Sequence, residues 1–424
     1  MPRVWLVNVE EVACADDAEY DSLWVPAVTG VYCVRFLFCL EPGDLLISPV
    51  AIPEGFLAYV RRVLGRPDTD AMVLLLERRS RPYGLAASVL EDRGLRDRLA
   101  RLGRAGGWVL EPYVESRRVV ELSKATGLPT DKTHPDFILN GTILKLNDKG
   151  YFRDLASRLG VPVMPGRLAR DRASIEAALE EVGREAPGRL FLKKTRYGGG
   201  MGNLCGTREE LLARLPSWYN QGEVLVEPAL DFESIAGTLM TLGHDCVRFW
   251  GVDLQHIDAH HWAGFDYPHP DQEASALLCG LSLKLANAVH RKRARGDLNL
   301  DWGLLREGSG GLRPVLLECN FRHNGFGHIL RFSRMYFGSR AQNLSTRFFL
   351  GFRLRDQGLG MEGLLGALRG LCDSGEPLLI ESPGRARGVV VMAAPADGVC
   401  ALAVFADSAG YLSRAETLLR EALA

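Results

Sequence analysis

The chain has 424 residues, which is too long for one hydrophobic core and predicts two or three domains. Its formal net charge of −1 and its ordinary apolar and charged fractions predict a soluble globular protein, without the basic footprint of nucleic-acid or membrane binding. The chain has nine Cys and no C-x-x-C pair, which leads us to expect reduced thiols. It has no apolar run of membrane-spanning length, and no basic segment precedes an apolar one at the start, so we expect a cytoplasmic protein.

Strand and helix patterns alternate through the first third of the chain. Short apolar runs at 3–9, 44–48 and 71–76 are typical of buried strands, and apolar residues recur with a helical period at 53–65 and 85–103. Strands that alternate with helices usually form a parallel sheet. The sequence therefore predicts an α/β arrangement here.

The middle and the end of the chain combine antiparallel strands with helices. Segments 234–254, 297–306 and 313–319 are expected to form one antiparallel sheet, with the glycine-rich residues 308–311 as the last turn. The other expected elements are strand 189–194, helices 172–184, 207–215 and 272–293, a linker at 351–360, helix 361–372, strands 388–394 and 399–405 and helix 408–422. The part after the linker predicts a small α/β cap.

A carboxylate, an amide and a guanidinium alternate where the apolar run 314–319 ends. Glu318, Asn320 and Arg322 occupy every second position, so the period of a strand places them on one face. Two adjacent oxygen donors, one of them anionic, suit a hard cation such as Mg²⁺, and the arginine could hold an anion beside it. An ordinary strand that runs into a turn has the same spacing. Cys319, between the two donors, is expected to point into the core.

Lysine is scarce, and half of it falls in two short segments. The chain has eight Lys against 43 Arg, and four of the eight are Lys145, Lys149, Lys193 and Lys194. Lys acts as a compact point charge suited to phosphate. The second pair ends an apolar strand and precedes glycines at 198–200, whose backbone N–H groups can approach phosphate oxygens. A flexible hairpin loop would explain the glycines but not the paired lysines.

A third segment, 223–230, is an apolar strand that ends in Glu227-Pro228. Proline cannot donate a ladder hydrogen bond, so pairing stops there and the chain changes direction. A crossing between two lobes at this point would expose backbone groups to an adenine edge, with Glu227 or Glu233 placed for the amino group or the ribose. By itself the segment is an ordinary strand-to-turn junction.

Histidines and aromatic residues gather between residues 256 and 269. The histidines could bind zinc, but no Cys lies at ligand spacing. They are His256, His260, His261 and, nearby, His269. We favour an exposed, substrate-facing loop, with Trp262, Phe265 and Tyr267 as walls for an aromatic group. The motifs of P-loop, nucleophile-elbow and zincin chemistry are absent from the sequence.

Taken in chain order, the segments with Lys149, with Lys193 and the glycines, with Glu227-Pro228, and with Glu318, Asn320 and Arg322 resemble the ATP-grasp superfamily of carboxylate–amine ligases. The resemblance implies an ATP-grasp domain at 136–350, with a lid at about 188–228, that binds ATP and Mg²⁺. Residue by residue it implies phosphate contacts from Lys149 and Lys193, a lid loop containing Gly199, Gly200 and Met201, an adenine hinge with Glu227, Pro228 and Leu230, a ribose contact from Glu233, the metal ligands Asp301, Glu318 and Asn320, and Arg322 as the catalytic residue that faces the transferred phosphate.

Residues 108–145 resemble the lead-in of a narrower group, the ATP-grasp peptide ligases of the kind that builds pheganomycin-type peptides. This resemblance implies a pre-ATP-grasp α/β domain at 1–135 and a small C-terminal α/β domain at 351–424. It also implies ligation of an amino-acid-like carboxylate to the amine of a peptide or amino acid, through an acyl phosphate and with formation of ADP. A homodimer is left open.

Two other hypotheses remain at this point. An ATP-grasp phosphotransferase would leave phosphate on its substrate without ligation, and a nucleotide-binding regulator would bind ATP without catalysis. The regulator is disfavoured because it needs neither the metal ligands nor the lysines. Carboxylation is disfavoured because no segment resembles a biotin carrier.

Overall fold

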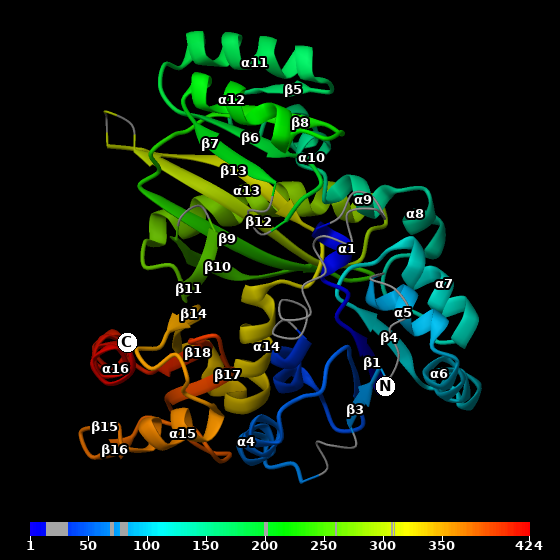
Figure 1. Cartoon of the computed structure of the whole chain (residues 1–424), viewed down its shortest axis with the longest axis vertical. Helices are drawn as coiled ribbons and strands as arrows, with labels where there is room; N and C mark the ends of the chain where they lie inside the picture. The colour runs from blue at the N-terminus through cyan, green and yellow to red at the C-terminus, as the bar shows by residue number, and fades with distance from the viewer. Residues whose placement is uncertain are drawn as a thin grey trace.

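The computed structural model describes residues 1–13, 33–67, 72–76, 84–198, 202–258, 261–306, 308 and 310–424. Figure 1 shows a small sheet with its helices at the top, a long sheet across the middle, and the N-terminal and C-terminal parts below. Among the helices of these ranges, none combines the length and the apolar character that a membrane crossing requires.

The N-terminal part is built on a four-stranded parallel sheet in the order β3-β2-β1-β4. Its elements include β1 (Arg3–Leu6), α1 (Glu10–Ala13), η1 (Phe36–Cys39), β2 (Leu45–Ser48), α4 (Glu54–Leu64), β3 (Val73–Leu75), α5 (Leu85–Glu91), α6 (Arg93–Ala105), β4 (Val109–Pro112) and α7 (Arg117–Thr126). Side chains alternate between the faces of β1. Val4 and Leu6 pack with α5, α6 and α7, whereas Trp5 and Val7 face a core shared with the C-terminal part. The predicted parallel arrangement is confirmed.

The helix expected at 85–103 is two helices, α5 and α6, which meet at Asp92. The Asp92 carboxylate accepts a hydrogen bond from the Leu95 backbone N–H at 2.9 Å and so caps α6. Both helices bury residues in the same core, so the apolar pattern continues across the break and does not reveal it.

A four-stranded antiparallel sheet in the order β5-β8-β6-β7 lies at the top of Figure 1 and includes the residues expected to form the lid. Its elements are β5 (Arg167–Ala169), α11 (Arg172–Glu185), β6 (Leu190–Lys194), β7 (Asn203–Gly206), α12 (Arg208–Trp218) and β8 (Val224–Pro228), preceded by α8 (Pro135–Leu139), α9 (Thr142–Leu146) and α10 (Lys149–Arg158). Asp171 and Thr207 cap α11 and α12 through their side chains. The expected helices 172–184 and 207–215 and strand 189–194 are confirmed.

An eight-stranded antiparallel sheet spans the middle of the molecule in the order β13-β12-β9-β10-β11-β14-β18-β17. Its strands are β9 (Ser234–Leu242), β10 (Val247–Asp258), β11 (His261–Tyr267), β12 (Gly296–Arg306), β13 (Leu312–Asn320), β14 (Ser345–Arg353), β17 (Gly388–Ala396) and β18 (Val399–Ala406). Helix α13 (Gln272–Arg291) packs on β10 and β9. The expected antiparallel sheet is confirmed, with segment 234–254 forming the hairpin of β9 and β10. Residue 309 of the expected turn lies outside the described residues.

Strand β14 continues through residues 351–353, so the linker expected at 351–360 is wrong at its start. Phe348 and Phe352 on β14 and Val404 on β18 are buried in one core, which makes the sheet continuous across the expected domain boundary. The remaining elements are α14 (Gly325–Phe337), η3 (Gly338–Asn343), α15 (Met361–Arg369), β15 (Cys372–Asp373), β16 (Glu376–Pro377) and α16 (Ala409–Leu423).

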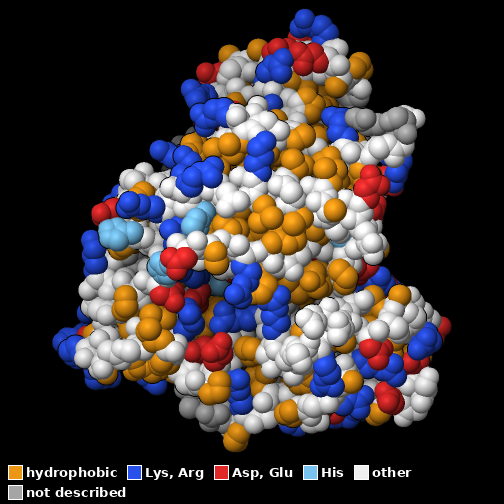
Figure 2. Space-filling view, turned by 180° about the vertical axis from the view of Figure 1, so that it is seen from behind, with side chains coloured by type: hydrophobic (Ala, Val, Ile, Leu, Met, Phe, Trp, Pro, Cys, Tyr) orange, Lys and Arg blue, Asp and Glu red, His pale blue; other side chains and the backbone are white. Residues whose placement is uncertain are grey.

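The N-terminal and C-terminal parts share one core. Tyr59 of α4 donates to the Ile380 carbonyl at 3.0 Å and accepts from the Val391 N–H at 3.1 Å, and the rings of Phe38 and Phe332 lie 5.3 Å apart. Seen from behind, the molecule carries a gathering of Lys and Arg side chains near the centre of its face, with acidic side chains beside them (Figure 2).

Candidate functional site

Two strands at one edge of the large sheet bring the expected metal ligands together. Asp301 on β12 lies opposite Glu318 on β13, and Asn299 lies opposite Asn320. The Asn320 amide donates to Asp301 Oδ2 at 2.7 Å, while Asn320 Oδ1 is buried and has no hydrogen-bond partner among the described residues. Buried polar atoms are normally satisfied, and Mg²⁺ prefers carboxylate and amide oxygens, so these residues fit the metal. Cys319 is buried in the core, as expected.

Glu318, Asn320 and Asp301 begin a row of polar side chains, here called the metal row, that continues across the sheet to residues that the sequence did not reveal. Asp253 on β10 and Asp301 on β12 both lie opposite Gly237 on β9. A Cβ at Gly237 would lie 2.5 Å from Asp253 Oδ1, so glycine leaves room for this carboxylate, which accepts the Gly237 N–H at 2.6 Å. Gln255 donates to Asp301 Oδ1 at 2.7 Å. Asp253 and Gln255 are two residues apart on β10, and only the register of the neighbouring strands shows that both lie near Asp301.

Negative charge accumulates on this row. Burial, followed by the nearby charge of Glu318, raises the pKa of Asp301 to about 7. Burial, followed by the charge of Asp301, raises the pKa of Asp253 well above its usual value. A bound divalent cation would offset this accumulation of charge.

Lys149 reaches the same row from the start of α10. Its ammonium lies 3.1 Å from Glu318 Oε1 and donates to the backbone carbonyl of Tyr197. The Lys149 backbone N–H donates to the Thr195 carbonyl at 2.9 Å, and the side chain is almost fully buried. The structure therefore brings this predicted phosphate-binding lysine beside the predicted metal ligands and the start of the lid loop.

Strand geometry separates the paired lysines at the end of β6, because successive residues of a strand face opposite sides. Lys193 Nζ lies 2.7 Å from Glu227 Oε2 on β8. Lys194 Nζ donates to Asn220 Oδ1 at 2.8 Å and lies over the ring of Trp218. Only Lys193 shares a face with the hinge carboxylate.

The glycine loop is only partly described. Gly199, Gly200 and Met201 lie outside the described residues. Gly202 follows them with a φ of +71°, and its carbonyl accepts the Lys194 N–H at 3.0 Å, so a residue free to adopt left-handed backbone returns the chain to β7.

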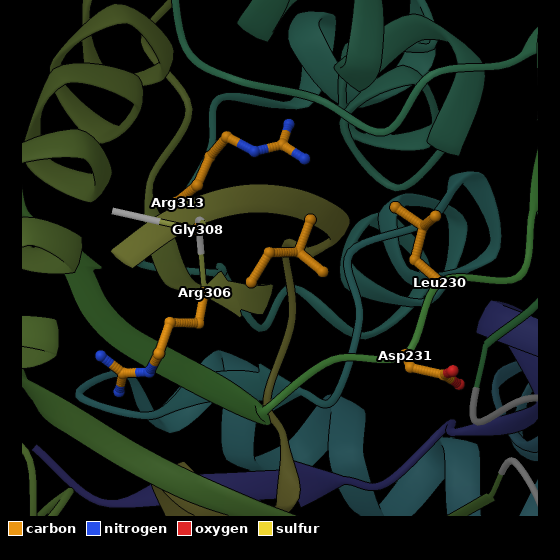
Figure 3. A pocket seen from close by; sticks show the side chains of 6 residues that line it. Leu230, Asp231, Arg306, Gly308 and Arg313 are labelled. Atoms are coloured by element: carbon orange, nitrogen blue, oxygen red, sulfur yellow. The ribbon is translucent and has the colours of Figure 1, made fainter. Parts of the chain in front are cut away.

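The end of the expected hinge borders a cavity of about 660 Å³, which is within the usual range for a small-molecule site. Strand β8 stops at Pro228, as expected, and the chain then passes over the end of the β12–β13 hairpin. The cavity is lined by Leu230, Asp231, Leu305, Arg306, Gly308 and Arg313 (Figure 3).

Glu233, expected to contact a ribose, is held by an arginine of this cavity. Arg306 donates to its two carboxylate oxygens at 2.8 and 2.6 Å, and both side chains are exposed. A ribose hydroxyl would therefore compete with Arg306 for Glu233.

Arg322 lies just beyond the metal ligands at the end of β13. Its guanidinium donates to Asn147 Oδ1 at 3.2 Å, and the Phe321 N–H donates to the same oxygen at 3.0 Å. Its positive charge opposes the rise in the pKa of Asp301 that burial and Glu318 cause. The structure thus places Arg322 near the metal row. Asn147 was not predicted, since an amide that binds backbone groups has no sequence signature.

A buried ionic network lies next to Arg322. Glu111 on β4 forms ion pairs with Arg3 and Lys132, and its Oε1 lies 2.7 Å from His323 Nε2. The other ring nitrogen of His323 lies 2.9 Å from Asp297 Oδ2 on β12. Burial would raise the pKa of Glu111, but Lys132, His323 and Arg3 outweigh it and hold this pKa well below its usual value. The network joins the N-terminal sheet to the residue that follows Arg322.

The expected substrate loop at 256–269 is wrong, because the segment is the hairpin of β10 and β11. Phe265 is fully buried, with its ring 5.0 Å from that of Phe326. Tyr267 packs on Phe326 at 5.2 Å, and Trp262 lies against Gly325. Phe265 lies in the core, and Trp262 and Tyr267 are partly buried against it, so the three rings pack with the core instead of lining an exposed loop.

The histidines of this hairpin do not meet as a metal site in the described part of the chain. His256 Nε2 lies 3.1 Å from Asp266, and His260 lies outside the described residues. No group of three or more His, Cys, Asp or Glu side chains among the described residues is arranged to hold a metal ion.

Comparison with known proteins identifies similar domains and folds. Residues 33–128 match the family model of the pre ATP-grasp domain, whereas no curated protein matches the chain. The crystal structure of N5-carboxyaminoimidazole ribonucleotide synthetase from Thermus thermophilus is 14% identical with a TM-score of 0.59, over 100% of this chain and 99% of that one.

Two carboxylase structures are similar over the whole of this chain. Biotin carboxylase from Campylobacter jejuni, in a complex with a form of ATP, is 16% identical with a TM-score of 0.63 and is covered over 91% of its length. The biotin carboxylase domain of Hydrogenobacter thermophilus 2-oxoglutarate carboxylase, with MgADP and bicarbonate, is 15% identical with a TM-score of 0.60 and 90% coverage. At such identities the likeness establishes the fold alone. The chain therefore has the ATP-grasp fold, a mixed α/β architecture, with a pre-ATP-grasp domain in its N-terminal part.

Proposed function

We propose that the chain is an ATP- and Mg²⁺-dependent ligase that joins an amino-acid-like carboxylate to the amine of a peptide or amino acid. The observation that carries the proposal is the convergence of Asp301, Glu318 and Asn320 with Lys149 and Arg322 at one edge of the sheet. Solved structures of the same fold hold ADP, ATP or MgADP.

Each group has a distinct task toward the nucleotide. The backbone from Glu227 to Leu230 would hold the adenine beside the 660 Å³ cavity. Lys149 and Lys193 would bind phosphate oxygens as point charges, with Lys193 sharing its ammonium between phosphate and Glu227. Asp301, Glu318 and Asn320 would hold Mg²⁺, which neutralises charge on the transferred phosphate when it is bound.

In the first step a carboxylate oxygen of the donor attacks the γ-phosphorus of ATP. The bond from that phosphorus to the ADP oxygen breaks, so an acyl phosphate and ADP form. Arg322 stabilises the charge on the transferred group, and Asn147 holds the guanidinium in place. Water would hydrolyse the acyl phosphate, so the site must exclude it during the reaction.

In the second step the nitrogen of the neutral amine attacks the carbonyl carbon of the acyl phosphate. A carbon–nitrogen bond forms, the carbon–oxygen bond to phosphate breaks, and inorganic phosphate leaves. The proton lost by nitrogen passes to solvent or phosphate. Positioning and charge neutralisation are the protein's main contributions to both steps.

The test is to incubate the protein with ATP, Mg²⁺ and pools of amino acids and short peptides, with Asp301→Asn as the inactive control. We expect substrate-dependent ADP release, and by mass spectrometry a product with the summed mass of donor and acceptor less one water. Added hydroxylamine should trap the acyl phosphate as a hydroxamate. Phosphorylated donor without amide or hydroxamate would establish the phosphotransferase alternative, and ATP binding without turnover across the pools would favour a regulator.

A second candidate is carboxylation of an amine with bicarbonate as the carboxylate. It is favoured by one observation, the likeness over nearly the whole chain to structures named as carboxylases and as a carboxyaminoimidazole synthetase. Two results together would select carboxylation over ligation. ADP release would require bicarbonate, and amino acids would not stimulate ADP release in bicarbonate-depleted buffer.

A further inference from the structure

A second cavity, of about 190 Å³, lies where β4 of the N-terminal sheet ends. Ligands of parallel sheets commonly bind beyond the carboxyl ends of the strands. Its walls combine apolar side chains from α8 and α9 with the segment that follows β4: Val114, Glu115, Ile138, Leu139 and Leu144, with Asn147 at one side. The volume is below the roughly 300–1,000 Å³ of pockets that enclose a whole ligand, so the cavity fits one end of a molecule.

Four charged residues line this cavity, Glu11, Glu115, Arg117 and Arg196, and Glu115 is the buried one among them. It is 8% exposed, and its Oε1 accepts the Thr133 N–H at 3.0 Å. Its Oε2 is buried and has no hydrogen-bond partner in the part of the chain that the structure describes. Burial raises the pKa of Glu115 to about 7, although Thr133 and Lys132 oppose the rise. A buried carboxylate oxygen without a donor is unfavourable, and a bound cation would satisfy it.

Two residues of the cavity wall connect it to the phosphate and metal residues. Asn147 lines it, and the Oδ1 of Asn147 accepts from Arg322 at 3.2 Å. Arg196 also lines it and lies 3.3 Å from Asp148, which caps the helix that Lys149 begins. A molecule in this cavity would therefore lie next to the groups that hold the transferred phosphate.

We propose that this cavity is the acceptor subsite and that Glu115 binds the ammonium group of an aliphatic amine substrate, which gives up one proton to the Glu115 carboxylate before the neutral amine attacks. The proposal rests on the proposed ligase function and names the chemistry of its amine. Ile138, Leu139 and Leu144 suit a short aliphatic side chain, and the single unpaired carboxylate oxygen suits the adjacent ammonium. The acceptor is thus a Leu-like amino acid, or a peptide that begins with one.

The test measures binding of leucinamide and of 4-methylpentanamide, which has the same shape without the amine, by ligand-observed NMR titration of the full-length protein. We expect wild-type protein to bind leucinamide about tenfold more tightly or better, as charge-assisted hydrogen bonds do. Glu115→Gln keeps the acceptor for Thr133 and should abolish this preference. Glu121→Gln makes the same change at an exposed site on α7 and should retain it.

A second variant guards against a folding defect in Glu115→Gln. Leu144 is 48% exposed at the rim, so Leu144→Trp should fold and should weaken leucinamide binding by obstruction. Equal binding of the two amides to wild-type protein, or an unchanged preference in Glu115→Gln, would overturn the assignment.

Hydroxamate formation separates this proposal from the ligase function itself. Trapping by hydroxylamine needs the donor and ATP but not the acceptor cavity, so Glu115→Gln should form hydroxamate at the wild-type rate. If wild-type protein and Glu115→Gln both form hydroxamate, and Glu115→Gln still prefers leucinamide, the assignment of the acceptor subsite is refuted while the ligase function stands. Absence of hydroxamate in wild-type protein refutes the ligase function, and with it the role of this cavity.

Discussion

Replacing Lys193 by Met would remove the cation beside Glu227 while keeping most of the apolar volume of the side chain. Lys193 Nζ lies 2.7 Å from Glu227, and bound phosphate would share this ammonium with the carboxylate. A hydrogen bond to a charged group contributes about 1.5–3 kcal/mol. Because about 1.4 kcal/mol corresponds to tenfold in Kd, we expect Lys193→Met to weaken ATP binding by roughly 10- to 150-fold.

The same substitution leaves a buried charge without its partner. Glu227 is 2% exposed, and removing one member of a buried ion pair costs about 3–5 kcal/mol. The single variant should therefore also unfold at lower temperature. The double variant Lys193→Met/Glu227→Gln removes both charges, so it should recover most of the thermal stability while its ATP affinity stays low.

Calorimetric titration with a non-hydrolysable ATP analogue and Mg²⁺ measures the affinity, and scanning fluorimetry measures the stability. Lys194→Met is the matched control, since it makes the same change on the opposite face of β6. Its ATP affinity should stay within about twofold of wild type, as for surface substitutions in general. Equal losses in the two lysine variants, or wild-type affinity in the double variant, would refute the assignment of Lys193 to phosphate.

Two further substitutions address the metal row and the transferred phosphate. Glu318→Gln keeps the shape of the side chain but removes a metal-binding charge. The Mg²⁺ concentration for half-maximal activity should therefore rise by roughly 10- to 100-fold, while the circular dichroism spectrum stays unchanged. Wild-type Mg²⁺ dependence would leave Glu318 as a strand-end residue only. Arg322→Met should lower kcat by roughly 10²–10³-fold with little change in ATP affinity, because the guanidinium acts mainly on charge that develops during transfer; steady-state kinetics with full activity would remove Arg322 from the mechanism.

The period of a strand was sufficient to place Glu318 and Asn320 together, because neighbours two apart on one strand share a face whatever lies around them. Asp253 and Gln255 could not be found in this way, since they reach Asp301 only through the register of β9, β10 and β12. The partners of a residue on another strand follow from pairing, which a single strand's pattern does not contain.

Burial and backbone irregularity account for the two wrong predictions. Trp262, Phe265 and Tyr267 have the composition of a binding surface and of a core alike. Phe265 and Tyr267 pack against Phe326, and Trp262 packs against Phe265 and Phe348, so tertiary packing decides for the core. Gly351 suggested a linker, but the pairing of β14 with β18 shifts register between Phe349 and Phe352, so the glycine lies within a strand irregularity.

The ionic network around Glu111 fixes how the molecule can open. Sliding the N-terminal sheet along the large sheet would part Glu111 from His323, while Arg3 on β1 would stay beside the carboxylate. The movement would therefore break a buried contact between the two sheets. The sheet β5-β8-β6-β7, expected to act as the lid, is in contrast separate from the large sheet, and its strand β8 ends at Pro228. We therefore expect the spacing between Arg322 and the wall that carries Glu115 to change little if the expected lid moves to admit substrates.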